Sequence, residues 1–175
     1  MKQLSDYIRS LPDFPKPGII FRDIVPLAQD PNGFRSAIDT LKEGVSGWGK
    51  IDKIAVPEAR GFVFGAPLAY ALNVGLVLMR KPGKLPFKTV SQEYELEYGT
   101  NTIEMHADAI SPSDRVIVLD DLLATGGTVA ACRKLIEKQG GIVIGAAFIV
   151  ELVDLKGREK FSDIPVFAPV VYSGE

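Results

Sequence analysis

Four short apolar runs, rich in valine and isoleucine, constrain the fold of this chain more than any other feature. They occupy residues 51–56, 76–79, 115–120 and 142–150. Uninterrupted apolar runs of this length are typical of strands that are buried on both faces of a sheet. Stretches of helical length, 62–72 and 128–139, lie between these runs. This alternation predicts an α/β fold with a central, mostly parallel sheet flanked by helices.

Outside this core, the sequence predicts two helices near the N-terminus and one irregular segment. Apolar residues recur at helical spacing between residues 4 and 11 and are followed by prolines, so we expect a short amphipathic helix there. Asp30 and Pro31 are typical of a helix start, because aspartate caps the helix and proline suits its first position. Residues 81–97 hold prolines, glycine and charges, and we expect them to leave the sheet as a mobile excursion.

Length and charge exclude several classes of protein. The 175 residues suit one domain, 1–175. With 20 basic and 22 acidic residues the formal charge is -2, so nucleic acid is not the expected partner. The single cysteine, Cys132, allows no intramolecular disulfide and suits a reducing compartment. No apolar run approaches the roughly 18 residues of a membrane span. We expect a cytoplasmic protein with no membrane partner.

Residues 116–128 combine a buried strand, two carboxylates, a loop of small residues and a helix start. The backbone N–H groups of a glycine-rich loop can surround an anion, and the helix N-terminus and the threonine hydroxyls favour the same ligand. The loop residues are Ala124, Thr125, Gly126, Gly127 and Thr128. Asp120 and Asp121 would repel a phosphate, so they suit ribose hydroxyls or a nearby Mg²⁺. The pattern predicts a site for a phosphorylated sugar, in which one aspartate meets the ligand and its neighbour braces the loop.

This segment resembles the phosphoribosyl diphosphate (PRPP) signature of the type I phosphoribosyltransferases. Other stretches, in order along almost the whole chain, are similar to the adenine-specific branch of that family. They are residues 14–24, 59–62, 80–86, 96–99, 151–152 and 155–158. The resemblance implies the type I phosphoribosyltransferase fold. Residues 1–35 would form the base-binding part of a hood, and residues 81–99 a flexible catalytic loop.

The resemblance also implies a reaction. An enzyme of this family transfers the 5-phosphoribosyl group from PRPP to adenine in purine salvage and gives AMP and pyrophosphate. Its cofactor would be Mg²⁺, held by PRPP and water near Asp120 and Asp121 and without a direct protein ligand. The family implies a homodimer.

The resemblance assigns pyrophosphate binding and proton transfer to further residues. Arg60, in the loop 57–61, would bind pyrophosphate, although alanine stands at position 59 where the family often has serine. Arg80 and Lys84 would reach pyrophosphate from the hood, Arg80 from the neighbouring subunit. Glutamates 93, 95 and 97 alternate, and only the family pattern selects Glu97 as the residue that holds or exchanges a proton near N7 of adenine. Tyr98 would pack in the closed hood.

By the same resemblance, Asp120 and Asp121 would bind the ribose hydroxyls, and the loop 124–128 the 5′-phosphate. Backbone groups of Ile20 and Arg22 would read the adenine edge, between apolar walls from Phe21 and Leu155. A 6-oxo purine would leave buried donors facing donors there. Two alternatives stay open: a phosphoribosyltransferase for another base, such as xanthine or orotate, and a PRPP-sensing regulator with the same fold.

Overall fold

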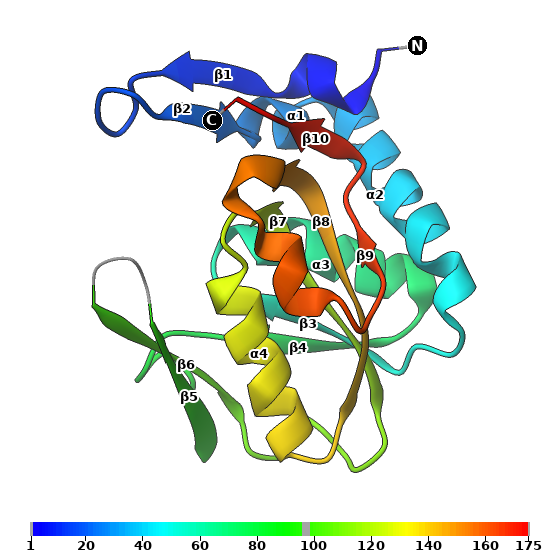
Figure 1. Cartoon of the computed structure of the whole chain (residues 1–175). Helices are drawn as coiled ribbons and strands as arrows, with labels where there is room; N and C mark the ends of the chain where they lie inside the picture. Colours follow the sequence, from blue (N-terminus) through cyan, green and yellow to red (C-terminus); the bar gives the residue numbers. More distant parts are fainter. Residues whose placement is uncertain (1, 96–98, 175) are drawn as a thin grey trace.

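The computed structural model describes residues 2–95 and 99–174 and is built around a six-stranded sheet (Figure 1). Its main path runs in the order β10-β8-β7-β3-β4, and β9 pairs with β8. All of these pairings are parallel, which confirms the predicted α/β class. The strands are β3 (Lys53–Pro57), β4 (Gly75–Met79), β7 (Arg115–Leu123), β8 (Ile142–Leu152), β9 (Val166–Phe167) and β10 (Val170–Tyr172).

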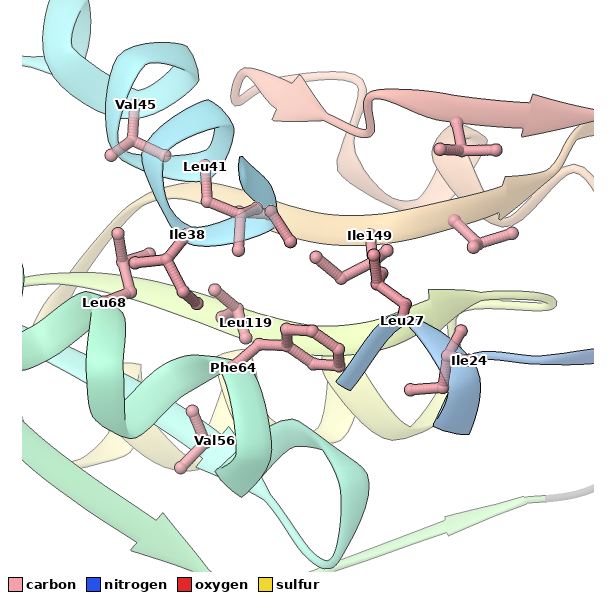
Figure 2. Close-up of a cluster of buried hydrophobic side chains, with 14 of the residues drawn as sticks. Ile24, Leu27, Ile38, Leu41, Val45, Val56, Phe64, Leu68, Leu119 and Ile149 are labelled. Atoms are coloured by element: carbon pink, nitrogen blue, oxygen red, sulfur yellow. The ribbon is translucent and has the colours of Figure 1, made fainter. Parts of the chain in front are cut away.

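Helices cover both faces of this sheet, because side chains along each strand alternate between two apolar clusters. On one face, α1 (Val25–Gln29), α2 (Pro31–Val45) and α3 (Arg60–Leu72) pack against the side of β7 that carries Leu119 (Figure 2). On the other, α4 (Gly127–Lys138) packs against the side that carries Val118. The predicted helix start at Asp30 and Pro31 is confirmed, because α2 begins there.

The cap of α2 shows why that helix begins where it does. Asp30 Oδ1 accepts hydrogen bonds from the backbone N–H groups of Asn32 and Gly33, both at 2.9 Å. These bonds satisfy two of the donors that a helix N-terminus leaves without an intrahelical partner.

The prediction of an amphipathic helix over residues 4–11 is wrong beyond Tyr7. A 3₁₀ helix, η1 (Leu4–Tyr7), is followed by β1 (Arg9–Pro12), which pairs with β2 (Ile20–Asp23) as an antiparallel hairpin. Pairing with β2 satisfies the backbone groups of β1, and of the apolar residues at helical spacing only Ile8 is buried. This hairpin carries the predicted base-binding residues.

The excursion after β4 leaves the main sheet as predicted, but much of it is regular. The strands β5 (Thr89–Glu95) and β6 (Thr100–His106) form an antiparallel hairpin, and Tyr94 packs against the second core with α4. Its predicted mobility stays a prediction. The remaining elements are η2 (Ser46–Trp48), η3 (Val153–Leu155) and η4 (Gly157–Phe161). Within the described part of the chain, no helix is long and apolar enough to cross a membrane.

Candidate active site

The carboxyl ends of the neighbouring strands β3 and β7 bring two loops to one edge of the sheet. The loop 57–61 follows β3 and leads into α3, and the loop 124–126 follows β7 and leads into α4. Ligands of open parallel sheets bind at this edge, where the chain turns from strand to helix. The two acidic residues lie within β7, which continues past Asp120 to Leu123, and not beyond its end.

Arg60 joins the loop 57–61 to β7. Its Nε lies 2.8 Å from Oδ2 of Asp121, whose side chain is only 6% exposed, while Arg60 is 46% exposed. Burial raises the pKa of Asp121, and the charge of Arg60 opposes that rise. The buried carboxylate therefore holds the guanidinium at the mouth of the site, with Nη atoms that can still meet a ligand.

Asp120 faces the other way, into a small pocket of about 80 Å³. Its Oδ1 accepts a hydrogen bond of 2.9 Å from the backbone N–H of Asp121. Burial and the neighbouring charge of Asp121 raise the pKa of Asp120 well above its ordinary value. The pocket is lined by Asp120, Leu122, Ala124, Thr125, Gly126, Gly127, Thr128 and Val129. The carboxylate of Asp120 and the residues of the loop thus line the same pocket.

The loop 124–126 is packed from behind by the chain after β8. A Cβ on Gly157 would overlap the carbonyl oxygen of Ala124, and a Cβ on Gly126 would lie 2.9 Å from the carbonyl oxygen of Gly157. Gly126 also has a φ of +74°, a conformation that favours glycine. The two backbones therefore touch, and Leu155, which is 40% exposed, lies two residues before this contact.

The β1–β2 hairpin reaches the same site through Phe21. The guanidinium carbon of Arg60 lies 5.8 Å from the centroid of the Phe21 ring, and Phe14 packs edge-on against that ring at 5.2 Å. Ile20 and Arg22, on either side of Phe21, are half-buried. Arg60, predicted for pyrophosphate, thus lies between Asp121, predicted for the ribose, and Phe21, predicted for the base.

Arg80 is tied to the loop 57–61 of its own chain. Its Nε lies 2.6 Å from Oε2 of Glu58, and its Nη1 donates to the carbonyl oxygen of Lys84 at 3.2 Å. Burial alone would raise the pKa of Glu58, but hydrogen bonds from Arg80 and the backbone of Lys81 hold it below its ordinary value. Lys84 takes part in this contact through its backbone carbonyl oxygen, and its side chain is exposed.

Two predicted residues, Glu97 and Tyr98, lie outside the described residues. Three others near the site were missed by sequence reasoning. The hydroxyl of Tyr94 lies 3.5 Å from Oγ1 of Thr128. The ring of Tyr172 stacks with Arg22 of the predicted base site, and Asp154, next to Leu155, accepts a hydrogen bond from the backbone of Gly174. These contacts join segments far apart in the chain, so no local motif marks them.

A metal ion would find few protein ligands here. Among residues 2–95 and 99–174, no group of three or more His, Cys, Asp or Glu side chains could hold a metal ion. Asp121 forms an ion pair with Arg60, and Asp120 lines the pocket. One or two carboxylates combined with substrate phosphates are what Mg²⁺ commonly uses, so the donor set fits an ion that a substrate brings with it.

Comparison with known proteins agrees with this geometry. Residues 27–170 match the family described as "Phosphoribosyl transferase domain". The chain is 52% identical to an adenine phosphoribosyltransferase of Fervidobacterium nodosum, over 97% of this chain and 99% of the relative. It is also similar to the crystal structure of the adenine phosphoribosyltransferase from Thermoanaerobacter pseudethanolicus, with a TM-score of 0.93, 51% identity, and coverage of 97% of this chain and 98% of that one. The enzyme from Saccharomyces cerevisiae, crystallised with adenine, is 40% identical with a TM-score of 0.88 and covers 95% of this chain and 96% of its own.

Proposed function

Since this chain belongs to the adenine phosphoribosyltransferases of the phosphoribosyl transferase family, we propose that it transfers the 5-phosphoribosyl group from PRPP to adenine and releases AMP and pyrophosphate. One observation carries the proposal on the structural side. Arg60 contacts Asp121 on one side and faces the Phe21 ring on the other. A ribose, a base and a leaving group that meet at one carbon need this juxtaposition.

The phosphate and ribose of PRPP occupy the pocket beside β7. The loop 124–128 offers backbone N–H groups and threonine hydroxyls to the 5′-phosphate, at the N-terminus of α4. Asp120, which opens into this pocket, accepts hydrogen bonds from the ribose hydroxyls. Asp121 acts mainly as the brace for Arg60, because its buried carboxylate is already paired.

The leaving pyrophosphate binds at the loop 57–61. Arg60 presents its Nη atoms there, and Arg80 is held beside the loop by Glu58. A guanidinium can donate two parallel hydrogen bonds to a phosphate group, which a lysine cannot. Lys84 adds a positive charge from the exposed excursion. When bound through PRPP and water near Asp120 and Asp121, Mg²⁺ supplies charge neutralisation to the departing group.

Adenine binds between the N-terminal hairpin and the turn after β8. Phe21 and Leu155 form its apolar walls, and backbone groups of Ile20 and Arg22 read its edge. Support comes from the half-buried ring of Phe21 beside Arg60 and from the exposed side chain of Leu155. We assign the base-binding part of the hood to residues 1–35.

The proton chemistry is assigned to residues 81–99. Glu97 acts near N7 of adenine while N9 attacks the anomeric carbon, and Tyr98 packs over the closed site. Both assignments rest on the resemblance to the family, because these two residues lie outside the described part of the chain.

We also propose a homodimer in the cytoplasm. Val63 and Tyr70 are exposed on α3, 41% and 89%, and Leu76 and Leu78 are exposed on β4 at the end of the sheet, 38% and 39%. Exposed apolar side chains gathered on adjacent elements suit an interface with a second copy. The buried thiol of Cys132 is consistent with a reducing compartment.

The test is nucleotide formation from PRPP and Mg²⁺ with adenine, hypoxanthine, guanine, xanthine and orotate in parallel. AMP formation that exceeds turnover of the other bases by orders of magnitude supports the proposal. Preferential turnover of another base would overturn the assignment of Ile20 and Arg22. Tight PRPP binding without turnover of any base would favour a PRPP-sensing regulator.

A further inference from the structure

The C-terminal residues contact both sides of the proposed adenine site. The guanidinium carbon of Arg22 lies 3.9 Å from the centroid of the Tyr172 ring. Two residues further on, the backbone N–H of Gly174 donates a hydrogen bond of 2.5 Å to Oδ2 of Asp154. Arg22 belongs to the hairpin that carries Phe21, and Asp154 immediately precedes Leu155. Residues 172–174 therefore connect the two walls between which the base would lie.

Tyr172 is a fixed platform for this contact. β10 pairs in parallel with the end of β8, so that Tyr172 lies opposite Leu152, and its ring packs against the main apolar cluster. In Figure 1, β10 lies beside the β1–β2 hairpin. The Arg22 guanidinium is held from a second direction, because Nη1 donates to Oγ of Ser10 at 2.6 Å. A stacked and hydrogen-bonded arginine fixes the position of the β2 backbone that carries it.

The opposite wall is fixed in a similar way. Leu155 lies in a turn whose ends are joined by an ion pair between the half-exposed Arg158 and the buried Glu151, with Arg158 Nε 2.9 Å from Oε1 of Glu151. The same turn touches the phosphate loop through Gly157. The bond from Gly174 to Asp154 adds a connection from this turn to the C-terminal strand. A displacement of residues 172–174 would therefore change the separation of Phe21 from Leu155.

We propose that residues 172–174 act as a clasp that sets the width of the base pocket, with Tyr172 and Asp154 as positioning residues for base specificity. This inference rests on the proposed function, because it uses the base site assigned above. The two contacts of the clasp, Tyr172 with Arg22 and Gly174 with Asp154, both reach residues beside the proposed adenine site. Its loss should therefore affect adenine and spare PRPP.

The test compares a variant that loses the stack with one that keeps it. Tyr172→Leu should raise KM for adenine about three- to twentyfold, as expected for a partly desolvated cation–π contact, and change KM for PRPP less than twofold. It should also narrow the preference for adenine over hypoxanthine. Tyr172→Phe keeps an aromatic face and should behave as the wild type. Val171→Thr, in the same strand with a side chain that is 54% exposed, controls for disturbance of β10.

Variants of Asp154 test the clasp independently of Tyr172. Asp154→Ala should raise KM for adenine in the same direction, and Asp154→Asn, which keeps an acceptor oxygen, should restore most of the loss. If Tyr172→Leu fails to fold, the Asp154 pair decides alone. Equal rises in KM for adenine and PRPP, or a Tyr172→Phe variant as impaired as Tyr172→Leu, would overturn the clasp.

Failure of the proposed function can be told apart from failure of the clasp. If the wild type prefers another base, the proposed function is wrong, and the clasp is tested on the KM of that base. If no base turns over, calorimetric binding of adenine to the PRPP-loaded protein replaces KM. Unchanged adenine affinity in both Tyr172→Leu and Asp154→Ala would then overturn the clasp.

Discussion

The Nε atom of Arg60 lies 2.8 Å from Oδ2 of Asp121, and the carboxylate is nearly inaccessible while the guanidinium is half exposed. This asymmetry separates two roles. The buried partner fixes the geometry, and the exposed partner is available to a ligand. Removing the exposed partner would leave a buried carboxylate unpaired, which costs more than the lost contact itself.

Arg60→Ala should therefore impair both stability and substrate use. We expect a loss of about 1–3 kcal/mol in the free energy of unfolding, typical of a buried polar group that loses its partner. KM for PRPP should rise at least tenfold. Arg60→Lys keeps the charge but not the two parallel hydrogen bonds, so it should recover most of the stability and little of the PRPP affinity. Chemical denaturation and initial-rate kinetics measure the two effects separately, and a Lys variant with normal PRPP affinity would contradict the role in pyrophosphate binding.

A second prediction concerns the glycine behind the phosphate loop. Gly157→Ala places a methyl group where it overlaps the carbonyl oxygen of Ala124, so the loop 124–126 must shift. KM for PRPP should rise about tenfold or more, because the 5′-phosphate loses backbone hydrogen bonds. Gly47→Ala is the matched control, since a Cβ there has nothing within 4 Å. Equal PRPP affinity in the two variants would show that the contact does not position the loop.

The parallel sheet and the phosphate loop were predictable because their signals are local. Continuous apolar runs mark buried strands, and the loop residues follow one another from Ala124 to Thr128. The pairings of Asp121 with Arg60 and of Arg22 with Tyr172 could not be predicted, since each joins distant segments. Helical spacing over residues 4–11 misled because the backbone pairing of β1 with β2 outweighs a short amphipathic pattern.

A third prediction distinguishes the proposed catalytic glutamate, Glu97, from the alternating glutamate Glu93. Glu97→Gln should slow turnover at least a hundredfold while the Kd for PRPP changes little, because the carboxylate would act on the base and not on PRPP. Glu93 is exposed in the strand β5, so Glu93→Gln is the matched control and should keep wild-type turnover. Single-turnover kinetics and PRPP titration check both variants. A normal rate for Glu97→Gln would remove this residue from the chemistry.

A fourth prediction concerns stability at low pH and the ion pair between Arg133 of α4 and Asp163, which follows η4. Arg133 donates to both carboxylate oxygens of Asp163 and lowers the pKa of Asp163 to about 2. A carboxyl with a depressed folded pKa contributes stability that is present above its unfolded value near 4 and is lost as the pH falls towards 2. The wild type should therefore exceed Asp163→Asn in thermal midpoint at pH 6, and the difference should shrink between pH 4 and 2. Glu159→Gln, an exposed control in η4, should show no such convergence.

The exposed apolar side chains of α3 and β4 predict how the chain associates. Tyr70 is 89% exposed and shares its helix face with Val63, and Leu76 and Leu78 are exposed on the adjacent strand β4. A glutamate at the centre of such a face would bury a charge on association, so Tyr70→Glu should convert a dimer to a monomer. Val171→Glu adds the same charge on β10, at the opposite end of the sheet, and should leave the dimer intact. Light scattering after size exclusion measures both, and a dimeric Tyr70→Glu variant would place the interface elsewhere. If Arg80 acts across the interface, as the family implies, the monomer should also lose PRPP turnover.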